Sequence, residues 1–209
     1  MKTYILLLVS LVLTLSSCGG TSEEEISAAL SELIPASYGL NEIYFGEGLP
    51  ISDDREDVEA FYAAMGTDND ISLNYHPVAA DCGYASVDEI KAATLEVFSE
   101  SYADYLFTMA FDGLSSVFNE DTEEQVTQTV SYARYMETDG ILTVRMNVVD
   151  EAIPLNRTYD TEDIEIIREK NSYILVEVQS YVDGQPDVMV EVKLVKNAEG
   201  EYRLDSPTY

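Results

Sequence analysis

Histidine and cysteine are almost absent from this chain of 209 residues, which contains only His76, Cys18 and Cys82. A zinc site needs three or four closely spaced ligands, which one histidine and one free thiol cannot supply. His76 and Cys82 have no obvious third partner, so a Cys–His catalytic pair is not expected. Glycine-rich phosphate loops, dinucleotide-binding motifs and G-x-S-x-G turns are missing as well. The sequence therefore predicts no catalytic residue, no metal ligand and no cofactor.

Basic residues are also scarce, since eleven Lys and Arg stand against forty Asp and Glu, for a formal net charge of −29. This charge opposes binding to nucleic acid and attraction to an anionic membrane surface. It is compatible with basic partners, with divalent cations, or with a solvated acidic surface that binds nothing. Asp68-Asn69-Asp70 begins like a calcium loop but lacks the later Gly and Glu, so an acidic turn is expected there.

The one long apolar run lies at the start of the chain, where Tyr4 to Leu15 follow a single lysine. The run is too short to span a bilayer comfortably and has the length of a signal-peptide core. Leu15-Ser16-Ser17-Cys18 resembles the lipobox of bacterial lipoproteins, in which the cysteine is acylated and becomes the new N-terminus. We therefore expect residues 1–17 to be a signal peptide and Cys18 to be the lipid attachment site, on the outer face of the bacterial cytoplasmic membrane.

Residues 18–25 read as the lipidated cysteine and a short tether, after which helical patterns begin. Apolar residues at helical spacing predict helices over 23–33, ended by Ile34-Pro35, and over 53–65, with a Gly-rich loop or short strand between them. Ser86 with Glu89 forms a capping box, and Ser99 restarts a helix that runs to Phe111.

The second half of the chain has the period of strands. One strand is expected at 71–78, a hairpin turns at Asp139-Gly140, and three or four more strands follow from residue 162 onwards. Helices precede strands and no helix separates the later strands. The sequence therefore predicts an α+β fold, in which N-terminal helices are followed by a curved antiparallel meander. Residues 26–209 form a single domain, or one with two lobes.

Two charged features lie outside these patterns. The acidic segment with Glu120, Asp121, Glu123 and Glu124 is either a solvated loop or a contact surface for a basic partner. Arg203 is expected to pair with an acidic residue and so hold the C-terminal segment in place. His76 is expected on the polar face of its strand, as a surface or edge residue.

The segment YHPVAADCGYASVDEIKAATLEVFSESYADYL, residues 75–106, resembles the N-terminal half of the IseA family, extracytoplasmic bacterial proteins that inhibit cell-wall D,L-endopeptidases. The matching positions are Tyr75, Asp81, Ile90, Phe98, Ser99 and Leu106. The resemblance implies a two-lobed α+β protein without catalysis of its own, which presents an acidic cleft to the enzyme. Its partners would then be the membrane, through the lipid anchor, and a basic cell-wall hydrolase.

Two alternatives stay open. The order of helices and strands also suits an NTF2-like cone, which closes a curved sheet around a pocket for a small ligand. A structural envelope lipoprotein is the other alternative. A pocket lined by Tyr and Met with an Asp would favour the cone, and an open acidic groove would favour the inhibitor.

Overall fold

The protein is described by a computed structural model that covers residues 21–65, 74–112, 114–119, 124–129, 133–148, 150 and 152–209, with the backbone alone for 114–119 and 124–129. The helices are α1 (Glu23–Tyr44), α2 (Arg55–Met65), α3 (Val87–Val97) and α4 (Glu100–Phe111). The strands are β1 (Tyr75–Pro77), β2 (Leu114–Asn119), β3 (Glu124–Thr129), β4 (Tyr135–Thr138), β5 (Ile141–Arg145), β6 (Arg157–Lys170), β7 (Tyr173–Val182), β8 (Gln185–Lys196) and β9 (Tyr202–Leu204). The predicted α+β class is confirmed. No helix in the described ranges is long and apolar enough to cross a membrane.

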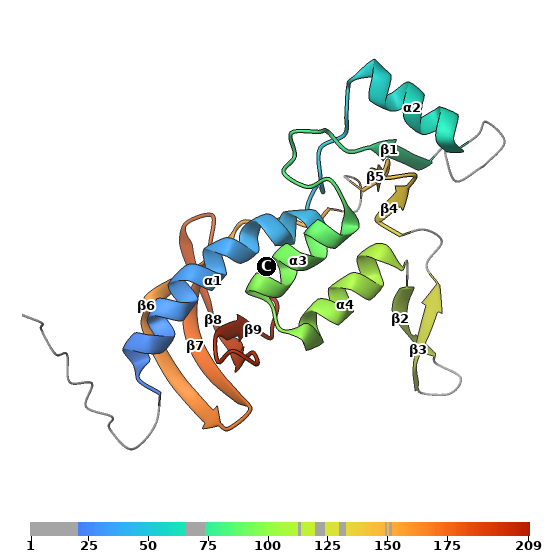
Figure 1. Ribbon diagram of the computed structural model, residues 1–209. Coiled ribbons are helices and arrows are strands. Elements are labelled where there is room, and N and C mark those ends of the chain that lie inside the picture. Colours follow the sequence, from blue (N-terminus) through green and yellow to red (C-terminus); the bar gives the residue numbers. More distant parts are fainter. Residues whose placement is uncertain are drawn as a thin grey trace, which may run out of the picture.

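A four-stranded antiparallel sheet, in the order β6-β7-β8-β9, forms one end of the molecule, and α1 lies across it beside α3 (Figure 1). Alternate residues of the central strands point toward the helices, so that Val176, Val178, Val192 and Leu194 are completely buried. This alternation is the one expected when only one face of an antiparallel sheet is covered. The predicted C-terminal meander is therefore present.

A smaller sheet, in the order β1-β5-β4, lies with α2 at the opposite end of the molecule (Figure 1). Its hairpin turns at Asp139 and Gly140, which both have positive φ values of 50° and 77°. Two successive residues of this kind suit the twist of a tight hairpin. The turn predicted at these two residues is confirmed. β2 and β3 pair as a further hairpin.

The predicted end of the first helix at Ile34-Pro35 is wrong, because α1 has 22 residues, Glu23–Tyr44, and contains the proline. Proline removes one backbone hydrogen bond within a helix and favours a break. The apolar period nevertheless continues past it, and Ile34, Leu40 and Tyr44 are all buried against the rest of the molecule. Burial of this face outweighs the local signal, so the segment predicted as a Gly-rich loop or strand is helical up to Tyr44.

The two predicted serine caps are confirmed. Ser86 Oγ accepts a hydrogen bond from the Glu89 amide at 3.2 Å, and Ser99 Oγ accepts one from the Tyr102 amide at 3.1 Å. Glu89 reaches back to the amide of Ala85 rather than to that of Ser86. The strand expected at 71–78 is described from residue 74 onward and forms β1.

Tyrosine takes a central place in the core, where Tyr44, Tyr75 and Tyr135 are among the largest fully buried side chains. Each hydroxyl has a partner, as burial of a polar group requires. Tyr44 shares a hydrogen bond of 2.7 Å with Thr94, and Tyr135 donates to the carbonyl of Ile43 at 2.9 Å. Burial raises the pKa of both hydroxyls above that of a free tyrosine.

We expect the free energy of unfolding to fall steeply once the pH rises above about 10, the ordinary tyrosine pKa. In the folded state burial raises the pKa of Tyr44, Tyr102 and Tyr135, and that of Tyr159 to about 12. The unfolded chain therefore releases these protons first, and the stabilisation present below pH 10 is lost as the pH rises. Denaturant titrations between about pH 8 and about pH 11 measure this slope. A Tyr44→Phe variant should show a shallower slope, and an equal slope would contradict the assignment to this residue.

Candidate functional site

A groove of about 790 Å³ lies between the corner that joins α3 to α4 and the hairpin of β8 and β9. We call it the α3–β9 groove. One wall consists of Leu95, Glu96, Phe98, Ser99, Glu100 and Ser101. The other consists of Val195, Lys196, Asn197, Ala198, Glu199, Glu201, Arg203 and Asp205.

The side chain of Arg203 connects the two walls of the groove through hydrogen bonds and ion pairs. Its Nε donates to the carbonyl of Leu95 at 2.9 Å, while Nη2 lies 2.8 Å from Glu201 and 3.4 Å from Glu96. The prediction that Arg203 pairs with an acidic residue is therefore confirmed. The side chain of Arg203 is only 11% exposed, so its guanidinium mainly contacts other groups of the protein.

A second set of polar contacts connects the same two walls. Ser99, which caps α4, donates its hydroxyl to Asp205, and the other oxygen of Asp205 lies 2.5 Å from the ammonium of Lys193. The backbone amide of Ser99 donates to the carbonyl of Leu204 at 2.8 Å. These bonds fix the helical corner to the last strand, so the walls of the groove are held rigidly relative to each other.

The turn between β8 and β9 is shaped by Asn197. Its side-chain carbonyl accepts hydrogen bonds from the amides of Glu199 and Glu201, at 3.1 and 2.8 Å. Gly200 completes the turn with a φ of 86°, a value that suits glycine. Hydrogen bonds from Asn197 and Arg203 lower the pKa of the Glu201 carboxyl, which favours its charged form. The turn thus presents two exposed carboxylates at the edge of the groove.

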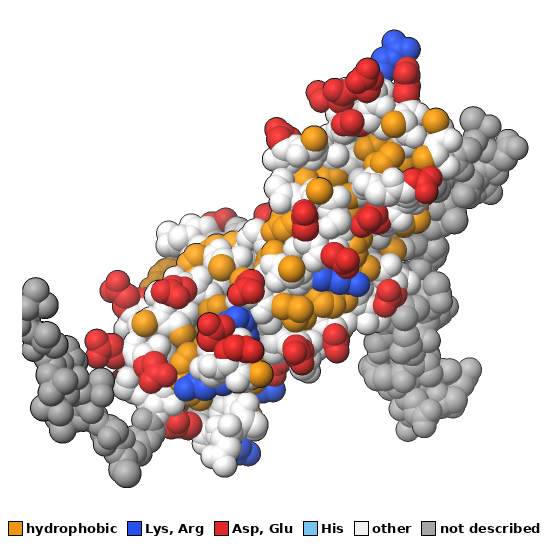
Figure 2. All heavy atoms as spheres, viewed as in Figure 1, with side chains coloured by type: hydrophobic (Ala, Val, Ile, Leu, Met, Phe, Trp, Pro, Cys, Tyr) orange, Lys and Arg blue, Asp and Glu red, His pale blue; other side chains and the backbone are white. Residues whose placement is uncertain are grey.

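The groove is negative on balance, because its walls carry five carboxylates and two cations. The side chains of Glu96 and Glu201 are 80% and 62% exposed, whereas Arg203 between them is nearly buried. Figure 2 shows that carboxylates are also scattered over the viewed face of the molecule. The groove differs from this background because its carboxylates surround a hollow that the exposed Leu95 also lines.

The groove carries no recognisable catalytic arrangement. Ser99 is bonded to Asp205, but the chain's single histidine lies on β1 in the other sheet, so no Ser–His–Asp relay can form. Among the residues that the structure describes, no cluster of three or more His, Cys, Asp or Glu side chains is arranged to hold a metal ion. What the groove offers is a set of hydrogen-bond acceptors and negative charges.

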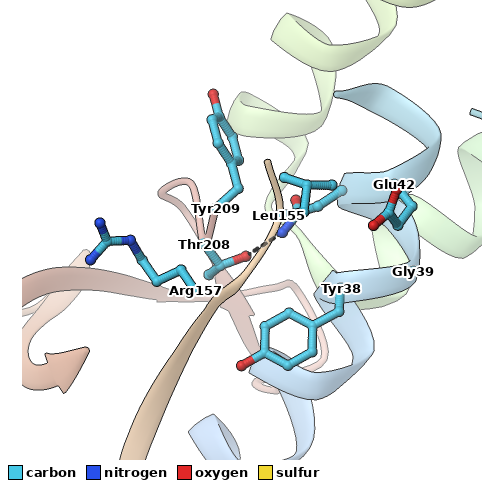
Figure 3. Close-up of a pocket in the computed structure, with 8 residues that line it drawn as sticks. Tyr38, Gly39, Glu42, Leu155, Arg157, Thr208 and Tyr209 are labelled. Atoms are coloured by element: carbon cyan, nitrogen blue, oxygen red, sulfur yellow. Dashed lines mark hydrogen bonds between the residues drawn. The ribbon is translucent and has the colours of Figure 1, made fainter. Parts of the chain in front are cut away.

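A second, smaller cavity of about 190 Å³ lies between α1, the segment before β6 and the C-terminal residues (Figure 3). Tyr38 and Tyr209 line it, and the side-chain amide of Asn41 donates to Thr208 at 2.9 Å at its back. The guanidinium of Arg157 points away from Thr208 and bonds Ser180 and Asp187 instead. The volume lies below the roughly 300–1,000 Å³ that is usual for small-molecule sites. The cavity also lacks the Met and Asp expected of the NTF2-like alternative.

The structure describes only one of the four acidic residues singled out in the sequence. Glu120, Asp121 and Glu123 lie outside the described residues, as does the predicted lipid attachment site Cys18. Glu124 begins β3, where its backbone is paired with Asn119.

His76 and Cys82 are not joined. His76 is half buried, and its Nε2 lies 3.1 Å from the carbonyl oxygen of Ser52. Cys82 donates to the carbonyl of Tyr84 at 3.1 Å and is a free cysteine. Neither side chain lines one of the cavities described above, so neither has a functional assignment.

Searches against protein-family models and against curated proteins find no match to this chain.

Proposed function

We propose that this protein is a membrane-anchored extracytoplasmic lipoprotein that acts as a non-enzymatic binding module. The α3–β9 groove would receive a basic segment of a protein partner, and a cell-wall D,L-endopeptidase is the partner that the sequence resemblance suggests. The observation that carries this proposal is the arrangement of Glu96 and Glu201, whose exposed carboxylates flank a groove where the intervening Arg203 is buried. Such a site attracts a cationic segment over a distance and holds it by charge-assisted hydrogen bonds.

The groove supports this function better than the ligand-binding alternative. Its volume of about 790 Å³ suits an inserted side chain or short loop, and it is open and acidic rather than closed and apolar. Leu95, which is 39% exposed, offers an apolar contact beside the charged rim. Buried apolar anchors with a polar rim are the usual composition of a protein–protein interface.

The test is a peptidoglycan-digestion assay with residues 19–209, in soluble form, and the D,L-endopeptidase catalytic domains of the same organism. We expect dose-dependent inhibition that weakens as salt is added, because screening reduces the attraction between charges. The variant Glu96→Lys/Glu199→Lys should weaken inhibition at least about tenfold, since like charges at an interface are strongly unfavourable.

A matched control is the variant Glu47→Lys/Glu56→Lys, which changes the net charge equally on exposed residues outside the groove. It should inhibit like the original protein. An equal loss of inhibition in both variants would show that only the total charge matters. The groove would then not be the binding site. Absence of inhibition against every D,L-endopeptidase of the organism would reject this class of partner.

A further inference from the structure

The start of the described chain is fixed to one end of the large sheet. The backbone amide and the hydroxyl of Thr21 both donate to Oε1 of Glu169, at 3.0 and 2.7 Å, close to the turn between β6 and β7. Ser22 then caps α1 by accepting from the amide of Glu25. Figure 1 shows the first turn of α1 and the β6–β7 turn at the same end of the molecule, opposite α2.

The predicted lipid attachment site is close to this end. Cys18 precedes Thr21 by three residues, and three residues of extended chain span roughly 10 Å. Acyl chains on Cys18 would therefore hold Thr21, Glu169 and the β6–β7 turn near the plane of the lipid headgroups. This step rests on the lipid anchor of the proposed function, but not on the α3–β9 groove.

Basic side chains gather at this same end, in a chain with only eleven Lys and Arg. Lys170 and Lys193 place their ammonium groups 5.5 and 5.4 Å from the centre of the Tyr173 ring. A hydrogen bond between Arg168 and the Tyr173 hydroxyl lowers the pKa of that tyrosine. The pairing of β6, β7 and β8 places Arg168 and Lys193 on either side of Leu175, on the face that the helices leave uncovered. We call Arg168, Lys170, Tyr173 and Lys193 the Tyr173 cluster.

The acidic residues of this end are mostly engaged elsewhere. Glu169 receives the two bonds from Thr21, and Glu25 accepts from the Tyr202 hydroxyl. Asp205 holds Lys193 in an ion pair. Arg168 and Lys170 are exposed and form no close ion pair with a carboxylate in the described part of the chain, although the charge of Glu191 acts on Arg168. Their charges are therefore directed to the solvent beyond the strand ends.

A hollow of about 450 Å³ opens beside the cluster. Lys170 and Tyr173 line it from the β6–β7 turn, and Lys196 and Tyr202 line it from the neighbouring hairpin. The ammonium of Lys196 lies 4.5 Å from the centre of the Tyr202 ring. Glu169 also lines the hollow, and Lys196 lies 3.6 Å from the carboxylate of Glu25, so Lys170 is its more available cation. A lysine beside a hollow of this kind suits a phosphate group, and tyrosines are common where proteins meet the headgroup region.

We propose that the Tyr173 cluster and this hollow dock the anchored protein onto anionic phospholipid headgroups. Each basic side chain near such a surface contributes roughly fivefold to the attraction. The rest of the chain is strongly negative and is repelled by the anionic bilayer. The β6–β7 turn therefore faces the bilayer, and α2 and the smaller sheet point away from it.

The test is amide hydrogen exchange on the full-length, lipidated protein in vesicles of phosphatidylcholine, with or without phosphatidylglycerol. Mass spectrometry of the mature N-terminus first establishes whether Cys18 is acylated. We expect the amides of residues 170–173 to exchange at least about fivefold more slowly on the vesicles with phosphatidylglycerol, and salt to abolish the difference. Lys170→Glu should remove the protection. Arg55→Glu, which changes the net charge equally on an exposed residue of α2, should leave it unchanged.

Equal exchange on the two kinds of vesicle, or protection elsewhere than the β6–β7 end, would overturn the docking proposal. Loss of protection in both variants would overturn it as well. If Cys18 is acylated but the amides of residues 170–173 are not protected from exchange, only the docking proposal is rejected. If Cys18 is unmodified, the lipid anchor is rejected as well. The inhibition assay uses soluble protein, so its result is independent of both outcomes.

Discussion

Replacement of Phe98 by alanine is expected to lower the free energy of unfolding by about 3–5 kcal/mol. Phe98 is 1% exposed and lies at the corner between α3 and α4, where its backbone forms a bridge with Leu204 of the last strand. Its ring lies 5.1 Å from that of Tyr102. Removal of the ring leaves a cavity where the helices meet the sheet, and the hydrogen bonds around Ser99 prevent the walls from closing it.

Equilibrium denaturation with urea, followed by circular dichroism, measures this loss. Leu95→Ala is a suitable control, because Leu95 belongs to the same corner but is 39% exposed. It should cost well under about 1 kcal/mol, as exposed substitutions usually do. A loss below about 1 kcal/mol for Phe98→Ala would mean that the corner is not part of the core.

The second large effect is expected at the C-terminal end, where Thr208→Val should cost about 1–3 kcal/mol. Thr208 is 1% exposed, and its hydroxyl lies 2.6 Å from that of Ser37 and accepts from the side-chain amide of Asn41 at 2.9 Å. Valine has nearly the same shape but offers no acceptor. Ser37 keeps its bond to the carbonyl of Ile34, whereas the buried amide of Asn41 loses its acceptor.

The same denaturation experiment tests this effect with two companion variants. Thr208→Ser keeps the hydroxyl and loses one methyl group, so it should cost only about 1 kcal/mol or less. The double variant Asn41→Leu/Thr208→Val removes both polar partners, and its cost should be smaller than the sum of the two single losses. A strictly additive cycle would show that the two side chains do not depend on each other.

Local features of the fold could be predicted from the sequence. Ser86 and Ser99 were identifiable as caps because a cap acts within three residues of itself. Asp139-Gly140 was identifiable as a hairpin because the two residues tolerate positive φ between apolar strands. The course of α1 past Pro35 was not predictable from local preference, because the decision depends on what Leu40 and Tyr44 pack against.

The groove could not be predicted for a related reason. It brings residues near position 96 together with residues near position 201, and no periodicity links segments that far apart. The sequence did indicate that Arg203 pairs with an acidic residue, but not that Glu96 on α3 is one of its partners. The acidic run around Glu123 was identifiable as a candidate contact surface because its charges are nearly consecutive. The carboxylates of the groove are separated in the sequence and come together only in the folded chain.

The hydrogen bonds of Thr208 also connect segments that are far apart in the sequence. Ser37 and Asn41 lie in the first helix, and their partner lies 171 and 167 residues later in the chain. A growing polypeptide therefore cannot form these two hydrogen bonds until Thr208 has been synthesised, so the packing of α1 is completed only after nearly all of the described chain has been made.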